Sequence, residues 1–229
     1  MLRAMPRVAR AVVAGGIYHV LNRGNARADI FLKPGDYEAF LRVLCEARER
    51  YPVDLFAWCL MTNHWHLVLR PREAPALSDF MRWVGVTHVR RYQEHYHQRG
   101  GGHLYQGRFK SFLVQSDAHF LTVCRYVEAN PVRAGMVRRA EHWQWSSLGY
   151  HPTSVPLVTC ADWPVDRPRG WADVVNQALP PTDADAVRIS ITRDRPFGDP
   201  AWTEQTVKRL GLLATVRPRG RPRKPKNEK

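Results

Sequence analysis

The chain has 229 residues, of which 44% are hydrophobic, so it can form one well-cored domain with an appendage or two small domains. Its formal net charge of +14 and isoelectric point near 10.2 favour a polyanionic partner, with nucleic acid ahead of a membrane surface, over a protein that is merely basic. No run of about eighteen apolar residues occurs, and Arg7 and Arg10 interrupt the short apolar stretch near the start, so neither a membrane span nor a signal peptide is expected.

The cysteine pattern favours a reducing compartment. The four cysteines are widely spaced and include no Cys-x-x-Cys pair: Cys45, Cys59, Cys124 and Cys160. This spacing supports neither a disulfide framework nor a zinc finger. We therefore expect a cytoplasmic protein.

Four strands and three helices are predicted in the first 130 residues, in the order strand-helix-strand-strand-helix-strand-helix. Apolar residues at period two predict strands, those at helical spacing predict helices, and clusters of Pro, Gly and Asn mark turns. The predicted strands are 16–22, 53–61, 64–69 and 107–114. The predicted helices run between Asp36 and Tyr51, over 77–97, and from a cap at Ser116 or Asp117 to Pro131.

The order of these elements predicts the fold class. The first six predicted elements run strand-helix-strand-strand-helix-strand. This order matches the split βαβ, ferredoxin-like arrangement, an α+β fold with an antiparallel sheet. With helices on one face, such a sheet would leave its other face available for a substrate.

The composition changes near Tyr150, and this change predicts the domain organisation. We expect a main domain over 1–150, an accessory region over 151–216 with short helices at 171–179 and 202–213, and a basic tail over 217–229. Residues 203–212 could belong to a small helix-turn-helix. The tail holds four arginines and three lysines against one glutamate, so it is expected to be disordered when free.

One strand carries a candidate metal site, the tripeptide His64-Trp65-His66. Strand side chains alternate between faces, so His64 and His66 share a face and Trp65 points to the other. Two imidazoles about 6 to 7 Å apart along a strand can hold one divalent metal ion. A pair of ordinary histidines is the alternative, and a third ligand and a nucleophile are needed to decide.

The predicted helix that ends at Pro131 supplies a candidate third metal ligand and a candidate nucleophile. Tyr126 and Asn130 are four residues apart before Pro131, so they share a helix face. A metal held by the two histidines and Asn130 would polarise a phosphodiester oxygen, and Tyr126 could then attack phosphorus and form a covalent phosphotyrosine. Helical spacing alone fits a half-buried packing tyrosine equally well.

Both runs resemble motifs of a known family. Residues 60–68 (LMTNHWHLV) resemble the HUH signature of single-tyrosine transposases, and residues 125–135 (RYVEANPVRAG) resemble their nucleophile helix. The chain is specifically similar to the REP-associated tyrosine transposases, which act on single-stranded hairpins. Three further runs agree: 18–25 (YHVLNRGN), 105–110 (YQGRFK) and 143–147 (WQWSS). The resemblance covers roughly residues 5–150.

The resemblance implies an HUH nuclease fold and a set of roles. It implies that His64 and His66 are metal ligands and that Tyr126 is the nucleophile. It also implies that Asn130 is the third metal ligand, at a position where related transposases can carry glutamine. The implied ion is Mg²⁺ or Mn²⁺, and the implied product is a 5′-phosphotyrosine with a free 3′-hydroxyl. The implied partner is single-stranded or hairpin DNA like a REP element, bound by a monomer or homodimer at the bacterial nucleoid.

Basic and aromatic residues supply candidate DNA contacts. Tyr105, Phe109 or Trp65 could stack on unpaired bases. In the tail, Arg219 and Arg221 belong to an Arg-Gly-Arg-Pro run that resembles an AT-hook, a motif of narrow minor grooves, although a generic basic tail is the alternative. The residues expected to neutralise backbone phosphates are Arg23, Arg90, Arg91, Arg108 and Lys110. Trp143 and Trp145 are predicted to be core residues.

Two other functions remain open on the sequence. One is a catalytically silent DNA-binding protein that keeps the fold. The other is a metal-dependent phosphoesterase or ribonuclease that uses a metal-bound water instead of Tyr126.

Overall fold

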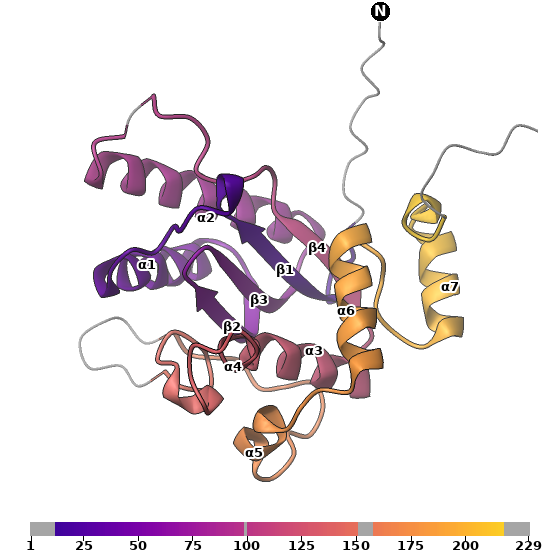
Figure 1. The fold of residues 1–229 in the computed structure, drawn as a ribbon. Coiled ribbons are helices and arrows are strands. Elements are labelled where there is room, and N and C mark those ends of the chain that lie inside the picture. The colour runs from indigo at the N-terminus through magenta and orange to yellow at the C-terminus, as the bar shows by residue number, and fades with distance from the viewer. Residues whose placement is uncertain (1–11, 99, 151–157, 218–229) are drawn as a thin grey trace, which may run out of the picture.

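The computed structural model describes residues 12–98, 100–150 and 158–217, arranged as a sheet between helices (Figure 1). The strands are β1 (Ile17–Arg23), β2 (Val53–Met61), β3 (His64–Pro71) and β4 (Lys110–Val114). The helices are α1 (Pro34–Arg50), α2 (Ala74–His95), α3 (Ala118–Glu128), α4 (Asn130–Arg133), α5 (Trp171–Asn176), α6 (Pro181–Arg193) and α7 (Pro200–Arg209). Short 3₁₀ turns lie at Asn25–Arg27, Ala140–His142 and Leu213–Thr215. Among the described residues, no helix is long and apolar enough to span a membrane.

The sheet confirms the predicted ferredoxin-like topology. The strand order is β2-β3-β1-β4, and every neighbouring pair is antiparallel. The predicted strands agree with the structure except that the fourth begins at Lys110 rather than at 107. The chain just before it is held in a loop, where the Asn22 side-chain amide donates to the Gly107 carbonyl at 3.3 Å.

Each face of the sheet packs against a different set of helices. On one face, strand residues such as Trp65 and Leu67 form a cluster with Phe40 of α1 and Phe80 of α2. The opposite face was expected to be open, and this expectation was wrong, because α3 packs across it (Figure 1). This face is therefore not available as a whole for binding a substrate.

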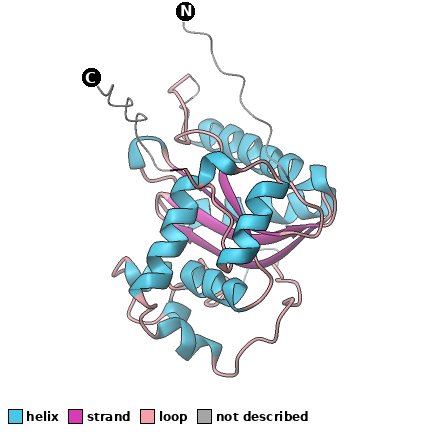
Figure 2. Ribbon diagram, turned by 90° about the vertical axis from the view of Figure 1, so that its right-hand side faces the viewer, coloured by secondary structure: helices cyan, strands magenta, loops and turns pink. Residues whose placement is uncertain are grey.

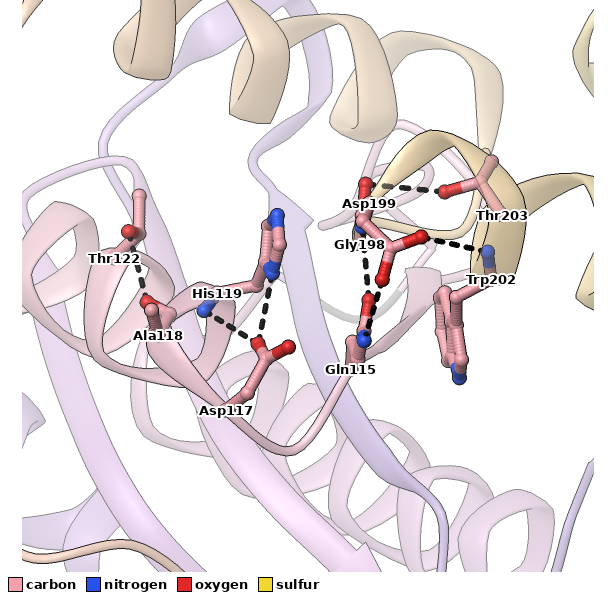
Figure 3. Close-up of polar contacts among 9 residues, drawn as sticks. All are labelled: Gln115, Asp117, Ala118, His119, Thr122, Gly198, Asp199, Trp202 and Thr203. Carbon is pink, nitrogen blue, oxygen red and sulfur yellow. Dashed lines mark hydrogen bonds and ion pairs between the residues drawn. The ribbon is translucent and has the colours of Figure 1, made fainter.

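Helix α3 presents the predicted nucleophile and is fixed at both ends. Asp117 caps its start, as predicted, by accepting from the His119 amide at 2.8 Å (Figure 3). The helix ends at Glu128, earlier than predicted, and Asn130 begins the separate short helix α4. Pro131 lies in the first turn of α4, where a missing N–H costs nothing, so it starts a helix instead of ending one.

A buried carboxylate anchors the end of α3. Glu128 is only 1% exposed and accepts hydrogen bonds from Ser147 Oγ and from Trp171 Nε1, both at 2.6 Å. Burial raises the pKa of Glu128, and the two donors oppose that rise. Trp145 is buried near this segment as predicted, and Trp143 is partly buried.

We expect Glu128→Ala to lower the free energy of unfolding by about 3 kcal/mol, because the buried Trp171 and the partly buried Ser147 would lose their acceptor. Urea unfolding followed by tryptophan fluorescence measures the loss. Glu49→Ala, at an exposed position, is the matched control and should stay within about 0.5 kcal/mol of wild type. Equal losses in the two variants would contradict the anchoring role.

The region after residue 158 completes the second face of the sheet. Trp171, Val187 and Phe197 belong to the same hydrophobic cluster as Phe112 and Phe120. Figure 2, which views the molecule from the side of α6 and α7, shows helices lying in front of the strands. The predicted boundary near residue 150 therefore does not separate two hydrophobic cores in the described residues. The helices predicted at 171–179 and 202–213 correspond to α5 and α7, and α6 was not predicted.

Backbone pairing ties this region to the edge of the sheet at β4. Val114 forms a parallel bridge with Phe197, and the Gln115 amide donates to the Phe197 carbonyl at 2.9 Å. The Gln115 side chain then exchanges two hydrogen bonds of 2.8 Å with Asp199, which caps α7 by accepting from the Trp202 amide (Figure 3).

The opposite edge, at β2, is also covered. The Leu60 amide donates to the Trp145 carbonyl at 2.8 Å, and the Ala161 amide donates to the Leu55 carbonyl at 2.7 Å. Segments outside the four strands therefore pair with β2 and with the end of β4.

Candidate active site between the histidine strand and helix α3

The two predicted metal ligands lie side by side on β3, on the face that α3 covers. The ring centres of His64 and His66 are 5.0 Å apart, with the ring planes at 83°. Pairing with β1 places Arg23 opposite His64. The shared face predicted for the two histidines is confirmed.

A hydrogen bond fixes the tautomer of His64. The Asn63 side-chain nitrogen donates to the Arg27 carbonyl at 3.0 Å, so its Oδ1 faces His64 and accepts from Nδ1 at 2.6 Å. Because an amide oxygen can only accept, Nδ1 carries the proton and Nε2 of the neutral ring is free to bind a metal ion.

His66 has an imidazole partner that the sequence did not reveal. Its Nδ1 lies 2.8 Å from Nε2 of His19 on β1, and the two rings are stacked with their centres 5.0 Å apart. When His66 Nδ1–H donates to His19, Nε2 of His66 becomes the free metal-binding nitrogen. His19 then carries its own proton on Nδ1, which is buried without a hydrogen-bond partner among the described residues.

All three imidazoles are held neutral. Burial, followed by the charge of Arg133, lowers the pKa of His19 to about 3. Burial, Arg23 and Arg133 lower the pKa of His64 to about 4, and burial and the neighbouring histidines lower that of His66. Neutral imidazoles are the form that binds metal ions.

The end of α3 brings the predicted nucleophile to this cluster. The Tyr126 ring is buried, and its centre lies 6.5 Å from that of His19 and 6.3 Å from that of His66, edge to face in both pairs. Asn130 follows on α4, where its Nδ2 donates to the Val127 carbonyl at 3.1 Å. The four residues predicted as catalytic or metal-binding therefore lie in one neighbourhood.

The donor set combines imidazole nitrogen with amide oxygen. His64 and His66 offer free Nε2 atoms, and Asn130 offers an amide oxygen, a mixture compatible with Mg²⁺ or Mn²⁺ when water or phosphate supplies the rest. Among the described residues, no three His, Cys, Asp or Glu side chains are arranged to hold a metal ion. A site here therefore depends on Asn130, or on the substrate, to complete the coordination.

Three of the predicted phosphate contacts lie on the β1 and β4 side of the molecule. Arg23 is next to His64, and its Nε is buried without a partner among the described residues. Arg108 is exposed, and the exposed Lys110 donates from Nζ to the Ile191 carbonyl of α6 at 3.3 Å. Their role in DNA binding stays a prediction.

The other predicted DNA contacts fall elsewhere. Arg90 and Arg91 belong to α2, which packs on the opposite face of the sheet, and Nη1 and Nη2 of Arg91 both donate to Glu46 at 2.8 Å. Tyr105 was expected to stack on bases, but the structure contradicts this, because the residue is buried and bonded to other side chains. Its hydroxyl accepts from Trp65 Nε1 at 2.9 Å and lies 2.6 Å from His88 Nδ1.

The two remaining aromatic candidates also pack inward. Trp65 is fully buried, and Phe109 is partly buried against the same cluster. Arg219 and Arg221 lie outside the described residues.

Comparison with known protein families decides the family. A family model described as "Transposase IS200 like" matches residues 12–130, just over half of the chain. The chain belongs to the IS200-like transposase family. The matched segment of this IS200-like transposase contains His19, His64, His66, Tyr126 and Asn130.

Individual proteins and solved structures are also similar to this IS200-like transposase. A Haemophilus influenzae protein described as a REP-associated tyrosine transposase is 24% identical over 169 residues, which cover 69% of this chain and 93% of that protein. A solved structure of a REP-associated tyrosine transposase bound to a REP hairpin superposes with a TM-score of 0.51 at 19% identity, over 69% of this chain and 98% of that one. A transposase structure from Deinococcus radiodurans has a TM-score of 0.38 at 17% identity, over 57% of this chain and 92% of that one.

Proposed function

We propose that this IS200-like transposase cuts single-stranded DNA next to a hairpin, and can rejoin it, through a covalent bond to Tyr126. The observation that carries the proposal is the position of Tyr126, buried against His66 with ring centres 6.3 Å apart. A packing tyrosine needs no imidazoles with free Nε2 atoms, whereas a phosphoryl-transfer nucleophile needs a cation site close by.

The reaction follows from the chemistry of these side chains. His64, His66 and Asn130 would hold Mg²⁺ or Mn²⁺, which, when bound, polarises a non-bridging oxygen of the scissile phosphate. The Tyr126 hydroxyl oxygen attacks phosphorus while its proton passes to solvent. The phosphorus–O3′ bond breaks, and the departing oxygen takes up a proton. The products are a 5′-phosphotyrosine and a free 3′-hydroxyl, and the reverse attack by a 3′-hydroxyl rejoins the strand.

The proposed substrate is supported by charge and by likeness. A net charge of +14 suits a polyphosphate partner, and a solved structure with the same fold is described as bound to a REP hairpin. Arg23, which pairs with His64 across β1 and β3, would meet the phosphate nearest the site. Such a protein would work on chromosomal hairpins, at the nucleoid of a bacterial cell.

The test is the formation of a denaturation-resistant protein–DNA band. Wild-type protein, incubated with Mn²⁺ and labelled hairpin oligonucleotides that carry single-stranded flanks, should form such a band on a denaturing gel. EDTA and His64→Ala should each remove it, because the cation site is lost. Band formation that survives both treatments would exclude the metal-dependent mechanism.

A further inference from the structure

A guanidinium lies among the residues proposed to hold the metal. Arg133 ends α4, three residues beyond the segment that the family model matches. Its Cζ is 3.7 Å from the centre of the Tyr126 ring, and its Nη2 donates to Asn130 Oδ1 at 2.5 Å. One side chain therefore contacts both the proposed nucleophile and the proposed third metal ligand.

Arg133 is an exposed residue, but its guanidinium lies against the Tyr126 ring. Loss of hydration lowers the pKa of its guanidinium from the ordinary value, with Tyr126 opposing that change. An arginine still remains charged at neutral pH. The charge of Arg133 also acts on the nearby imidazoles. Together with burial it lowers the pKa of His19, and together with burial and Arg23 it lowers the pKa of His64.

This arrangement conflicts with a divalent ion at the same place. The two cations would repel each other, and they would do so more strongly in an enclosed site than in water. The Asn130 amide is also committed, because its oxygen accepts from Arg133 and its nitrogen donates to the Val127 carbonyl. Metal binding to the DNA-free protein must therefore work against Arg133.

We infer that Arg133 opposes metal binding in the DNA-free protein and makes it depend on a DNA phosphate. The inference rests on the metal site of the proposed function. A phosphodiester brings a negative charge and several acceptor oxygens, so a guanidinium and a divalent ion can bind it together. When the phosphate arrives, Arg133 donates to it and releases Asn130 Oδ1. Arg133 is then a further catalytic residue, because it touches the reacting phosphate.

The affinity of the full-length protein for Mn²⁺, measured by electron paramagnetic resonance of the free ion, tests the inference. Arg133→Met keeps an unbranched side chain over the Tyr126 ring and removes the charge. It should bind Mn²⁺ about tenfold more tightly than wild type in the absence of DNA, a coupling of ordinary size between two sites. Arg138→Met removes an exposed arginine close by in the chain and should leave the affinity unchanged. Thermal melting confirms that each variant is folded.

A phosphodiester probe completes the test. The dinucleoside phosphate TpT should tighten Mn²⁺ binding to wild type but not to Arg133→Met. Equal or weaker Mn²⁺ binding by Arg133→Met without TpT would overturn the inference, because an arginine that merely supports Asn130 would strengthen the site.

The variant His64→Ala distinguishes failure of the inference about Arg133 from failure of the proposed metal site. If His64→Ala loses Mn²⁺ binding while Arg133→Met binds no more tightly than wild type, the inference about Arg133 fails and the proposed metal site stands. If His64→Ala binds Mn²⁺ as wild type does, the proposed metal site itself fails.

Discussion

Replacement of Tyr126 by phenylalanine should lower the rate of covalent protein–DNA adduct formation by at least about a thousandfold, because the oxygen that bonds to phosphorus is gone. The phenyl ring keeps its place under Arg133 and against His19 and His66. The variant should therefore remain folded and bind Mn²⁺ as before. Initial rates of adduct formation, from denaturing gels of labelled hairpin oligonucleotides with Mn²⁺, measure the effect.

Tyr92→Phe is the matched control, since Tyr92 is another buried tyrosine but lies on α2, on the other face of the sheet. It should retain the full rate. Strand cleavage that continues in Tyr126→Phe without an adduct would favour the phosphoesterase with a metal-bound water. Hairpin binding by wild type without any adduct, over a broad set of oligonucleotides, would favour the silent DNA-binding protein.

Acidification from about pH 6.5 to about pH 4 should sharply reduce the stability of the metal-free protein. Burial lowers the pKa of His88 to about 4, against a small opposing effect of Asp36, and lowers that of His19 to about 3. An unfolded histidine titrates near pH 6.5, so the unfolded chain binds more protons throughout this window. The free energy of unfolding therefore falls as the pH falls, by about 3 kcal/mol for a histidine shifted as far as His88. Urea unfolding at pH 7 and pH 4.5 measures the change.

His88→Gln isolates one contribution to this acid sensitivity. A glutamine oxygen can accept from the Tyr105 hydroxyl, which lies 2.6 Å from His88 Nδ1, and it does not titrate. The variant should lose less stability than wild type over the same pH range. His103→Gln, at an exposed histidine, should follow wild type. Identical losses in all three proteins would show that buried histidines do not cause the effect.

Local patterns were enough to predict the frame of the site. Strand alternation placed His64 and His66 on one face, and helical spacing placed Tyr126 near Asn130. These rules concern residues close in the chain, and the structure confirms the shared face of the two histidines and places the Tyr126 ring near His66. The single helix predicted to carry both Tyr126 and Asn130 was wrong, because α3 ends at Glu128 and Asn130 begins α4. The order of strands and helices predicted the topology for the same reason.

The remaining parts of the site depend on long-range pairing. His19 meets His66 only through the register of β1 on β3, which alternation within a strand does not determine. Arg133 was read as part of a family motif and given no role, because its contact with Tyr126 arises from the turn between α3 and α4. Tyr105 stands near basic residues in the sequence, yet tertiary packing buries it.

The covering of the second face was missed because its sequence signal is weak. Helix α6 buries a stripe of small or short side chains, Ala184, Val187 and Ser190, which is hard to distinguish from a polar loop. Helix α3 was predicted, but helical spacing does not determine which face of the sheet a helix covers.

The covered outer strands limit how two copies of this chain could associate. An exposed strand edge offers unpaired amides and carbonyls to a second molecule, and sheets often extend across dimers in this way. Here residues around Trp145 and Ala161 occupy one edge and Phe197 the other, and all of them follow the segment shared with the family. A chain cut after residue 150 would reopen the β4 edge and gain a tendency to self-associate. In the intact chain, a homodimer could not continue the sheet through the amides and carbonyls that these segments already occupy.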